Sequence, residues 1–362
     1  MNERVFNFYA GPATLPLSVL EQAKEEMLNY NGTGMSIIEI SHRSKDFEKV
    51  IFEAEALMKE LLGIGDDFKV LFLQGGASTQ FFMIPMNFLY EGKTAEYILT
   101  GSWSEKALKE AQMIGKVHVA ASTKEENYKR IPSMNEIILG ENPAYVHITS
   151  NNTIFGTQWQ QFPDVRDIPL VADMSSDLLS RAFDVSKFDL IYAGAQKNLG
   201  PSGVTIVIIR KEFLKKAKAP GNTMLKYSTH VEKDSLYNTP PSFAIYIVNL
   251  VLKWIKENGG LAEMEKINKE KAGIIYDAID TSGGYYKGHA EKGSRSLMNI
   301  TFTMANSELE KIFVEEATAQ GLIGLKGHRS VGGLRASLYN AMTLEGCKAL
   351  REFMKEFQRK NG

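Results

Sequence analysis

The most informative segment of the sequence is Asp189-Leu190-Ile191-Tyr192-Ala193-Gly194-Ala195-Gln196-Lys197-Asn198-Leu199-Gly200-Pro201-Ser202-Gly203. The β-branched run Val204-Thr205-Ile206-Val207-Ile208-Ile209 follows it. Two apolar runs joined by a loop rich in glycine and proline predict two buried strands. Lys197 lies between these strands, where burial favours the neutral amine, and a neutral amine can attack an aldehyde. A lysine whose head group reaches water beside a turn accounts for the same pattern.

A second short strand upstream ends in an acidic residue. It reads Leu170-Val171-Ala172-Asp173-Met174-Ser175-Ser176 and ends in a carboxylate and hydroxyls. Because α/β sheets bind ligands at the carboxyl edge of their strands, we expect Asp173 and Lys197 at one edge. A lysine that binds an aldehyde, with a carboxylate that faces a pyridine nitrogen, is the pattern of a pyridoxal phosphate (PLP) site.

The composition is that of an enzyme rather than of a nucleic-acid or membrane protein. The chain has 362 residues, 44% of them hydrophobic, and its net charge is −1. We therefore expect no general attraction to nucleic acid or to an anionic membrane. The single cysteine, Cys347, rules out an intrachain disulfide framework and a cysteine metal cluster, and we expect no metal site. Without a secretory signal or an apolar run near ~20 residues, the expected location is the cytoplasm.

The order of the predicted elements indicates the fold class. Strands and helices alternate over residues 70–209, which is typical of a doubly wound α/β sheet. The last hundred or so residues read instead as a smaller α+β unit. We expect an N-terminal arm at residues 1–16 that packs with this small domain, a large domain at residues 17–258 and the small C-terminal domain at residues 259–362. Neither a GxGxxG motif nor a GxxxxGK[ST] motif is present, so nucleotide binding is disfavoured.

Several segments at the predicted sheet edge suit a flat, phosphorylated ligand. The turn Gln74-Gly75-Gly76-Ala77-Ser78-Thr79-Gln80, between a strand and a helix expected at residues 81–89, is suited to a phosphate. Ser78 and Thr79 serve equally well as helix N-caps. Trp103 follows a predicted strand and could lie flat against a heteroaromatic ring, or simply pack in the core. Thr153 could donate to a ring oxygen or only shape its turn.

Two basic clusters are candidates for anion binding. His42 and Arg43 precede a helix expected at residues 45–62, and an exposed arginine is the plain alternative. His328, Arg329 and Arg335 lie among glycines in the C-terminal part, where they suit a small dianion or a carboxylate, or form a solvated basic loop. Asn238 and Thr239 read by default as an ordinary turn before Pro240.

Taken together, these motifs resemble the phosphoserine aminotransferase family, which belongs to the class V, fold-type I PLP enzymes. The matching segments are FNFYAGPATLP, ISHRSKDF, GGASTQF, TGSWSEKA, NNTIFGTQ, ADMSSD, YAGAQKNLGPSGV, YNTPPSF and GHRSVGGLRAS, in this order along the chain. No single segment is specific, but together they are. The resemblance implies a large PLP-binding domain, a small C-terminal domain and a homodimer with the active site at its interface.

The resemblance also implies roles for the cofactor-site residues. Lys197 binds the cofactor covalently and later moves the proton, and Asp173 pairs with the ring nitrogen. Trp103 stacks on the ring and Thr153 bonds its 3′ oxygen. The cofactor phosphate is held by Ala77, Ser78 and Gln196, and by Asn238 and Thr239 of the other subunit.

For the substrates, the resemblance implies transfer of an amino group from L-glutamate to 3-phosphohydroxypyruvate, giving O-phospho-L-serine and 2-oxoglutarate. A parallel step on a phosphorylated four-carbon analogue in vitamin B6 synthesis is a further implication. Arg43 binds the α-carboxylate of glutamate and Arg335 shares in carboxylate recognition. His42, His328 and Arg329 meet the substrate phosphate, some of them across the interface. Some relatives carry an arginine where this chain has Ser78, so one cation for the substrate phosphate is missing here.

Two other functions compete with this one. A cysteine desulfurase-like enzyme of the same superfamily needs a nucleophilic thiol in a mobile loop, whereas Cys347 lies in a predicted amphipathic helix. A non-catalytic PLP-binding or scaffold protein would keep Lys197 and Asp173 but has no need for the cluster of His328, Arg329 and Arg335.

Overall fold

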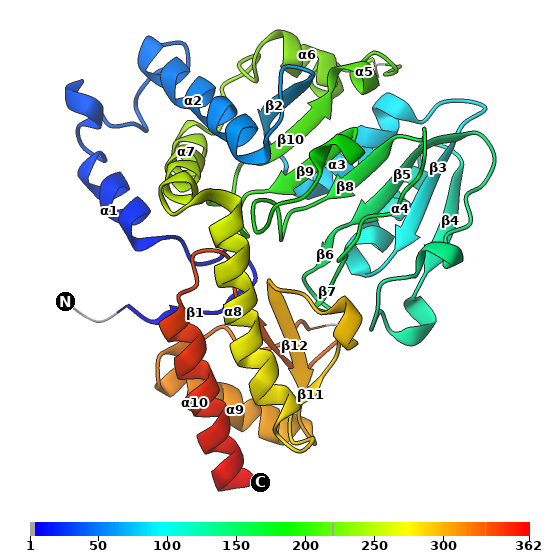
Figure 1. Ribbon diagram of the computed structural model, residues 1–362. Helices are drawn as coiled ribbons and strands as arrows, with labels where there is room; N and C mark the ends of the chain where they lie inside the picture. The colour runs from blue at the N-terminus through cyan, green and yellow to red at the C-terminus, as the bar shows by residue number, and fades with distance from the viewer. Residues whose placement is uncertain (1–3, 219–220, 330) are drawn as a thin grey trace.

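A mixed seven-stranded sheet forms the centre of the larger part of the molecule (Figure 1). The computed structural model describes residues 4–218, 221–329 and 331–362. The strands of this sheet lie in the order β2 (Phe68–Leu73), β10 (Thr205–Arg210), β9 (Leu190–Gly194), β8 (Leu170–Asp173), β5 (Pro143–Thr149), β3 (Thr94–Leu99) and β4 (Val117–Ser122). Only β10 runs antiparallel to its neighbours, and the other pairs are parallel. The predicted mainly parallel α/β sheet is therefore confirmed.

Helices cover both faces of this sheet because its strands are apolar on both faces. Val70 and Phe72 pack on one face, in a cluster with α2 (Lys45–Leu62) and α7 (Ser242–Glu257). Leu71 and Leu73 pack on the other face, with α3 (Gly76–Phe88) and α4 (Ser102–Gln112). The alternation follows from the two-residue period of a strand. The remaining elements of this part are α1 (Leu17–Glu25), α5 (Lys211–Leu214), α6 (Tyr227–Glu232), β6 (Asn151–Asn152) and β7 (Thr157–Gln158).

Two helix boundaries differ from the sequence prediction. Helix α1 ends at Glu25 rather than near residue 30. Beyond it, Asn29 accepts from the Gly34 amide and Thr33 donates to the Tyr30 carbonyl, and such local side-chain bonds compete with a helix. Helix α3 begins at Gly76, five residues earlier than predicted, because Gly75 adopts the left-handed conformation that lets the chain turn into the helix. Helix α2 has the predicted bounds.

The smaller part is an α+β unit built on a three-stranded antiparallel sheet. Its elements are α8 (Gly260–Asp280), β11 (Lys287–Gly288), β12 (Asn299–Thr303), α9 (Ser307–Ala319), β13 (Leu322–Ile323), β14 (Leu334–Ser337) and α10 (Leu344–Asn361). Figure 1 shows α8 in yellow, running from the larger part into the smaller one beside α10. The arm contributes β1 (Phe6–Asn7), which pairs in parallel with β13. Residues 1–3 of the predicted arm lie outside the described residues.

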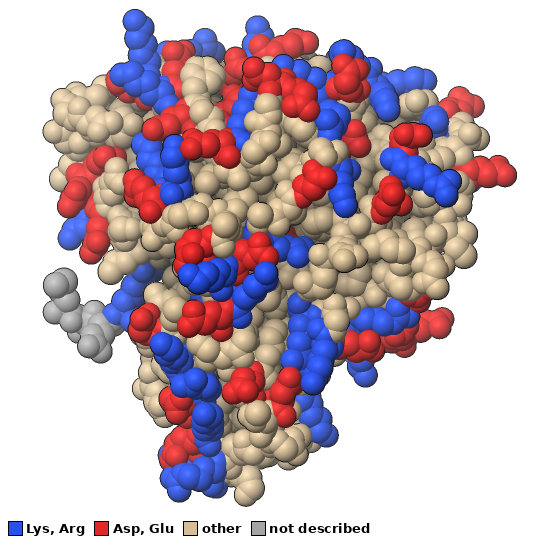
Figure 2. All heavy atoms as spheres, in the orientation of Figure 1, with Lys and Arg blue, Asp and Glu red and all other residues tan. Residues whose placement is uncertain are grey.

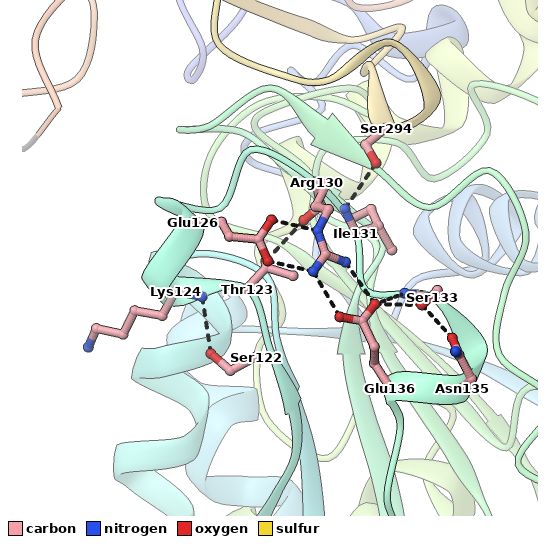
Figure 3. Close-up of polar contacts among 10 residues, drawn as sticks. All are labelled: Ser122, Thr123, Lys124, Glu126, Arg130, Ile131, Ser133, Asn135, Glu136 and Ser294. Carbon is pink, nitrogen blue, oxygen red and sulfur yellow. Dashed lines mark hydrogen bonds and ion pairs between the residues drawn. The ribbon is translucent and has the colours of Figure 1, made fainter.

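Hydrogen bonds join the two parts of the molecule. The buried side chain of Asn151 donates from Nδ2 to Ser176 Oγ and to Asn299 Oδ1, at 2.8 Å each. At the surface, Arg130 binds the carboxylates of Glu126 and Glu136, and the next residue, Ile131, donates its amide to Ser294 Oγ at 3.0 Å (Figure 3). A loop that follows β4 is thereby attached to the segment that precedes β12.

The surface carries both charge signs. Figure 2 shows Lys and Arg side chains interspersed with Asp and Glu over the visible face, in keeping with the net charge of −1. Across residues 4–218, 221–329 and 331–362, no helix combines the length and the apolar character that crossing a membrane requires.

We expect the small unit to depend on its aromatic core. The Phe313 ring is fully buried, with ring centroids 4.9 Å from Phe353 and 5.1 Å from Phe357. Phe313→Ala should lower the free energy of unfolding by about 3–5 kcal/mol, because the cavity cannot close fully. Urea denaturation measures this loss. Ile138→Ala is the control, since that side chain is 70% exposed and its loss should cost under ~1 kcal/mol. Equal effects of the two changes would contradict the packing described here.

Candidate active site

A cavity of about 280 Å³ lies at the carboxyl ends of β8 and β9. It is where the sequence places Asp173 and Lys197, because parallel strands present their carboxyl ends at one edge. Elements far apart in the sequence contribute its walls. The lining residues are Ala10, Gly11, Gly76, Ala77, Ser78, Trp103, Thr153, Ile154, Asp173, Ser175, Gln196, Lys197, His328 and Arg335.

Lys197 is the amine of this cavity. Its Nζ donates to Thr153 Oγ1 at 2.7 Å and lies 5.4 Å from the centre of the Trp103 ring. Loss of hydration lowers the pKa of Lys197 to about 8; the negative charge of Asp173 opposes this effect and the positive charge of Arg335 adds to it. A larger fraction of the amine is therefore neutral near neutral pH than in an ordinary lysine.

Asp173 is the buried carboxylate of the cavity. It is the last residue of β8, and its Oδ1 accepts from the Ser175 amide at 2.9 Å. Burial raises the pKa of Asp173, while Lys197 and the bond from Ser175 partly offset the rise. A buried carboxylate is most stable beside a positive group, so Asp173 suits a ligand that carries a positive charge at this depth.

Trp103 and Arg335 present unpaired donors. Among the described residues, neither Trp103 Nε1 nor Arg335 Nε has a hydrogen-bond partner, although both atoms are buried. Arg335 lies on β14, and its Nη1 donates to the Thr153 carbonyl at 3.2 Å. Burial lowers the pKa of the Arg335 guanidinium. Because buried donors are normally paired, these atoms point to a ligand with acceptor groups.

The first turn of α3 forms another wall. Ala77 and Ser78 belong to this turn, whose amides have no partner within the helix. The turn depends on Gly75, where φ is +90° and an added Cβ would lie 1.9 Å from Thr79 Oγ1. A helix N-terminus with a hydroxyl is a favourable site for a phosphate.

The donor set of the cavity fits PLP. The cofactor has a phosphate, a flat pyridine ring with a basic nitrogen, and an aldehyde. The cavity offers the N-terminus of α3 with Ser78, the indole of Trp103, the carboxylate of Asp173 and the amine of Lys197. Each group of the cofactor thus meets a residue of suitable chemistry.

Other predicted site residues lie outside this cavity in the single chain. Arg43 is exposed, and its Nε donates to His42 Nε2 at 3.4 Å in the loop before α2. Arg329 is exposed beside the cavity residue His328.

Asn238 and Thr239 also lie outside the cavity. Asn238 Nδ2 donates to Gln74 Oε1 at 3.0 Å, and Gln74 Nε2 donates to the Thr239 carbonyl at 3.2 Å. Asn238 lines a separate cavity, whose wall also includes Gln74 and Gly75. The polypeptide therefore does not bring His42, Arg43, Asn238 and Thr239 to its own Lys197.

Sequence reasoning missed several residues of the site. Ala10 and Gly11 of the arm line the cavity, and the Ala13 amide donates to the Gln196 carbonyl at 2.9 Å. The available sequence signal was the pair Gly11-Pro12, which follows an aromatic run and indicates a turn. In the structure Gly11 has a φ of +147°. Lys106 was also missed. Its Nζ lies 4.3 Å from the centre of the Trp103 ring. Lys106 follows Trp103 by three residues on α4, so the two side chains lie on the same side of the helix.

The pKa of Lys197 gives the site a testable pH dependence. Only the neutral amine attacks an aldehyde, so covalent attachment of PLP to the cofactor-free protein should accelerate with pH, with a midpoint near 8. Arg335→Gln removes a positive neighbour, which stabilises the ammonium and should move the midpoint upward. Stopped-flow absorbance measures the rate. Arg329→Gln is the control, because Arg329 is exposed and lies outside the cavity lining. A downward shift in Arg335→Gln would contradict this electrostatic account.

Comparisons with known proteins agree with the site. The sequence profile of the class-V aminotransferases matches residues 5–350. The phosphoserine aminotransferase of Herpetosiphon aurantiacus is 61% identical over 358 residues, 99% of each chain. The solved structure of the phosphoserine aminotransferase from Bacillus circulans subsp. alkalophilus superposes with a TM-score of 0.98 at 58% identity, covering 100% of both chains. The PLP-bound phosphoserine aminotransferase of Trichomonas vaginalis gives a TM-score of 0.92 at 41% identity, covering 97% of this chain and 100% of the other. The chain therefore belongs to the class-V aminotransferases and, among them, to the phosphoserine aminotransferase family.

Proposed function

We propose that this protein is a PLP-dependent transaminase that converts 3-phosphohydroxypyruvate and L-glutamate to O-phospho-L-serine and 2-oxoglutarate. The observation that carries the proposal is the convergence, in one cavity, of an amine with a lowered pKa, a buried carboxylate and the basic residues Arg335 and His328. The high identity to phosphoserine aminotransferases over almost the full chain supports the choice of substrates.

The cofactor-site residues each have a proposed task. When bound, PLP supplies an electron sink that stabilises negative charge at the α-carbon of the substrate. Lys197 Nζ holds the cofactor and moves the α-proton, for which a pKa near 8 is well matched to neutral pH. Asp173 keeps the ring nitrogen charged, and Trp103 orients the ring. Thr153 holds the amine and the ring oxygen, while Ala77, Ser78 and Gln196 hold the phosphate.

The substrate residues are proposed to select for acidic groups. Arg335 has a buried Nε without a partner among the described residues, and a guanidinium pairs well with a carboxylate. His328 lies in the cavity wall, and its pKa is lowered by burial and by the neighbouring charges of Arg335, Arg329 and Lys106. A dianion brought next to these cations would raise that pKa again. Each substrate carries a carboxylate and a second acidic group, so one basic cavity can accept both in turn.

Ser78 makes the glycine-rich turn less basic than an arginine would. The substrate phosphate then depends more on His328, Arg329 and the partner's cations. We propose that Lys106, beside Trp103, adds to the positive potential at this end of the cavity. We expect Ser78, in place of an arginine, to change the affinity for the substrate phosphate but not the amino transfer itself.

We further propose a homodimer that shares its active sites. His42, Arg43, Asn238 and Thr239 lie outside the cavity of their own chain, so a second chain is needed to bring them to a cofactor. The apolar side chains of Leu17, Leu28 and Ile38 are exposed, at 53%, 85% and 59%, and a subunit interface would cover them. The division at residues 16 and 258 and the cytoplasmic location stay predictions.

The competing functions lose support in the structure. Cys347 is fully buried in α10, and burial raises the pKa of its thiol to about 12. A thiol in this state is a poor nucleophile, which argues against desulfurase chemistry. A scaffold protein has no use for the basic residues that line the same cavity as Lys197.

The half-reaction tests the proposed substrates. We expect L-glutamate and O-phospho-L-serine to convert the yellow PLP form of the protein to the pyridoxamine form, followed by absorbance. Alanine and aspartate should react slower by a factor on the order of 100, because they leave the basic groups of the cavity unpaired or misplaced. Equal rates for all four amino acids would remove the basis for the roles of Arg43 and Arg335.

Mixing two inactive variants tests the shared site. Lys197→Ala lacks the amine, and Asn238→Asp places a negative charge where the partner's cofactor phosphate is expected. Refolding the two together in equal amounts should restore about a quarter of the sites, because half of the dimers are mixed and each has one intact site. Activity of the mixture is compared with that of each variant refolded alone. No gain on mixing would contradict sites built from two subunits.

A further inference from the structure

A buried amine outside the cavity has no place in the mechanism above. Lys271 lies on α8 and is fully buried. Its Nζ donates to the carbonyl oxygens of Leu338 at 3.0 Å, Tyr339 at 2.8 Å and Asn340 at 3.4 Å. In its charged form this amine has three donors, and the three carbonyls then engage all of them.

The lysine is not explained as one half of an ion pair. In the described part of the chain, no carboxylate lies within ion-pair distance of Lys271, and the titratable group that faces it is the buried thiol of Cys347 on α10. Loss of hydration lowers the pKa of Lys271 to about 7. An apolar side chain would avoid this cost, but among the described residues it would leave the carbonyl oxygens of Leu338 and Asn340 without a donor. The Tyr339 carbonyl would keep its bond from the Met342 backbone N–H at 2.9 Å. Lys271 therefore serves the conformation of residues 338–340.

That three-residue segment contacts three parts of the active site. It directly follows β14, the strand that carries Arg335. Tyr339 donates its hydroxyl to the carbonyl of Ala10, a cavity residue, at 2.7 Å. The backbone N–H of Asn340 donates to Oδ1 of Asn198, the residue after Lys197, at 2.9 Å.

A second residue on α8 supports the same segment. Asn268 lies three positions before Lys271, on the same side of the helix. Its Nδ2 donates to Asn340 Oδ1 and to the carbonyl of Ser180, at 2.8 Å each. The Asn340 side chain donates in turn to the Leu179 carbonyl at 2.9 Å. These bonds are buried, so they hold the segment in one position more firmly than exposed bonds would.

We propose that Lys271 is a positioning residue for substrate binding. By holding the carbonyls of residues 338–340, it fixes Arg335 and Ala10 relative to Lys197, and thereby sets the affinity of the cavity for acidic substrates. This proposal rests on the proposed transaminase function, since it assigns Arg335 to the substrate carboxylate.

The experiment compares Lys271→Met with Lys266→Met in the PLP-loaded protein. Lys266 lies on the same helix but is exposed and paired with Glu263, so its loss should change little. In Lys271→Met, the KM values for L-glutamate and O-phospho-L-serine should each rise about 10-fold or more, while kcat falls less than about threefold. The absorbance of the bound cofactor should stay as in the parent protein. Hydrogen exchange, read by mass spectrometry, should speed up in the peptide that covers residues 338–340.

A second variant keeps the test decisive if Lys271→Met does not fold. Tyr339→Phe removes only the hydroxyl, which donates to the Ala10 carbonyl and accepts from Asn299 Nδ2. It should raise the same KM values by about threefold or more. Where both variants fold, their combined effect on KM should be smaller than the product of the two, because they act on one segment.

Several outcomes overturn the proposal. Unchanged KM values in Lys271→Met with only a lower melting temperature would reduce Lys271 to a stabilising residue. The same conclusion follows from unchanged exchange at residues 338–340, or from an unchanged KM in Tyr339→Phe when that is the only variant that folds. If the parent protein itself fails to react with L-glutamate, the proposed function is wrong, and faster hydrogen exchange in Lys271→Met would still support the structural half of the inference.

Discussion

The Lys197 amine lies where the indole of Trp103 and the ends of two strands replace most of its water. Among the described residues, only the hydroxyl of Thr153 accepts a hydrogen bond from it. Asp173 supplies a negative charge nearby, yet the loss of hydration outweighs that charge and the pKa falls to about 8. A lysine kept near its neutral form and a carboxylate that lacks a full counter-charge leave the cavity ready for a cationic ring with a reactive aldehyde. The other features of the site support this pair of residues.

The fold maintains that arrangement from three directions. Parallel pairing of β8 with β9 sets Asp173 beside the strand that leads to Lys197. Only two residues separate β2 from helix α3, and the first turn of α3 faces the cavity. The small unit contributes Arg335 and His328 to the cavity wall, and the N-terminal arm contributes Ala10. Since the small unit is attached through buried polar bonds, the position of Arg335 depends on contacts such as those of Lys271 and Asn151.

Asp173 and Lys197 could be predicted from the sequence because both follow short apolar runs bounded by polar or turn-forming residues, a pattern that indicates buried strands. The same logic gave the mainly parallel sheet and the bounds of α2. The start of α3 was missed because a left-handed Gly75 is invisible to periodicity. Ala10, Gly11 and Lys106 were missed because their nearness to Lys197 or Trp103 is a product of tertiary packing. Lys271 carries no local signal at all, since its partners lie about seventy residues further along the chain. The roles proposed for His42, Arg43, Asn238 and Thr239 came from family resemblance and need a second subunit, which a single chain does not display.

Borohydride reduction of the PLP-loaded protein, followed by proteolysis and mass spectrometry, tests whether Lys197 is the residue that binds the cofactor. Reduction makes the link between cofactor and amine permanent, so the modified peptide identifies the attachment site. We expect the added mass on the peptide that contains Lys197, and no added mass on the corresponding peptide of Lys197→Ala. A label on another lysine, or none on protein whose absorbance shows bound cofactor, would contradict this assignment.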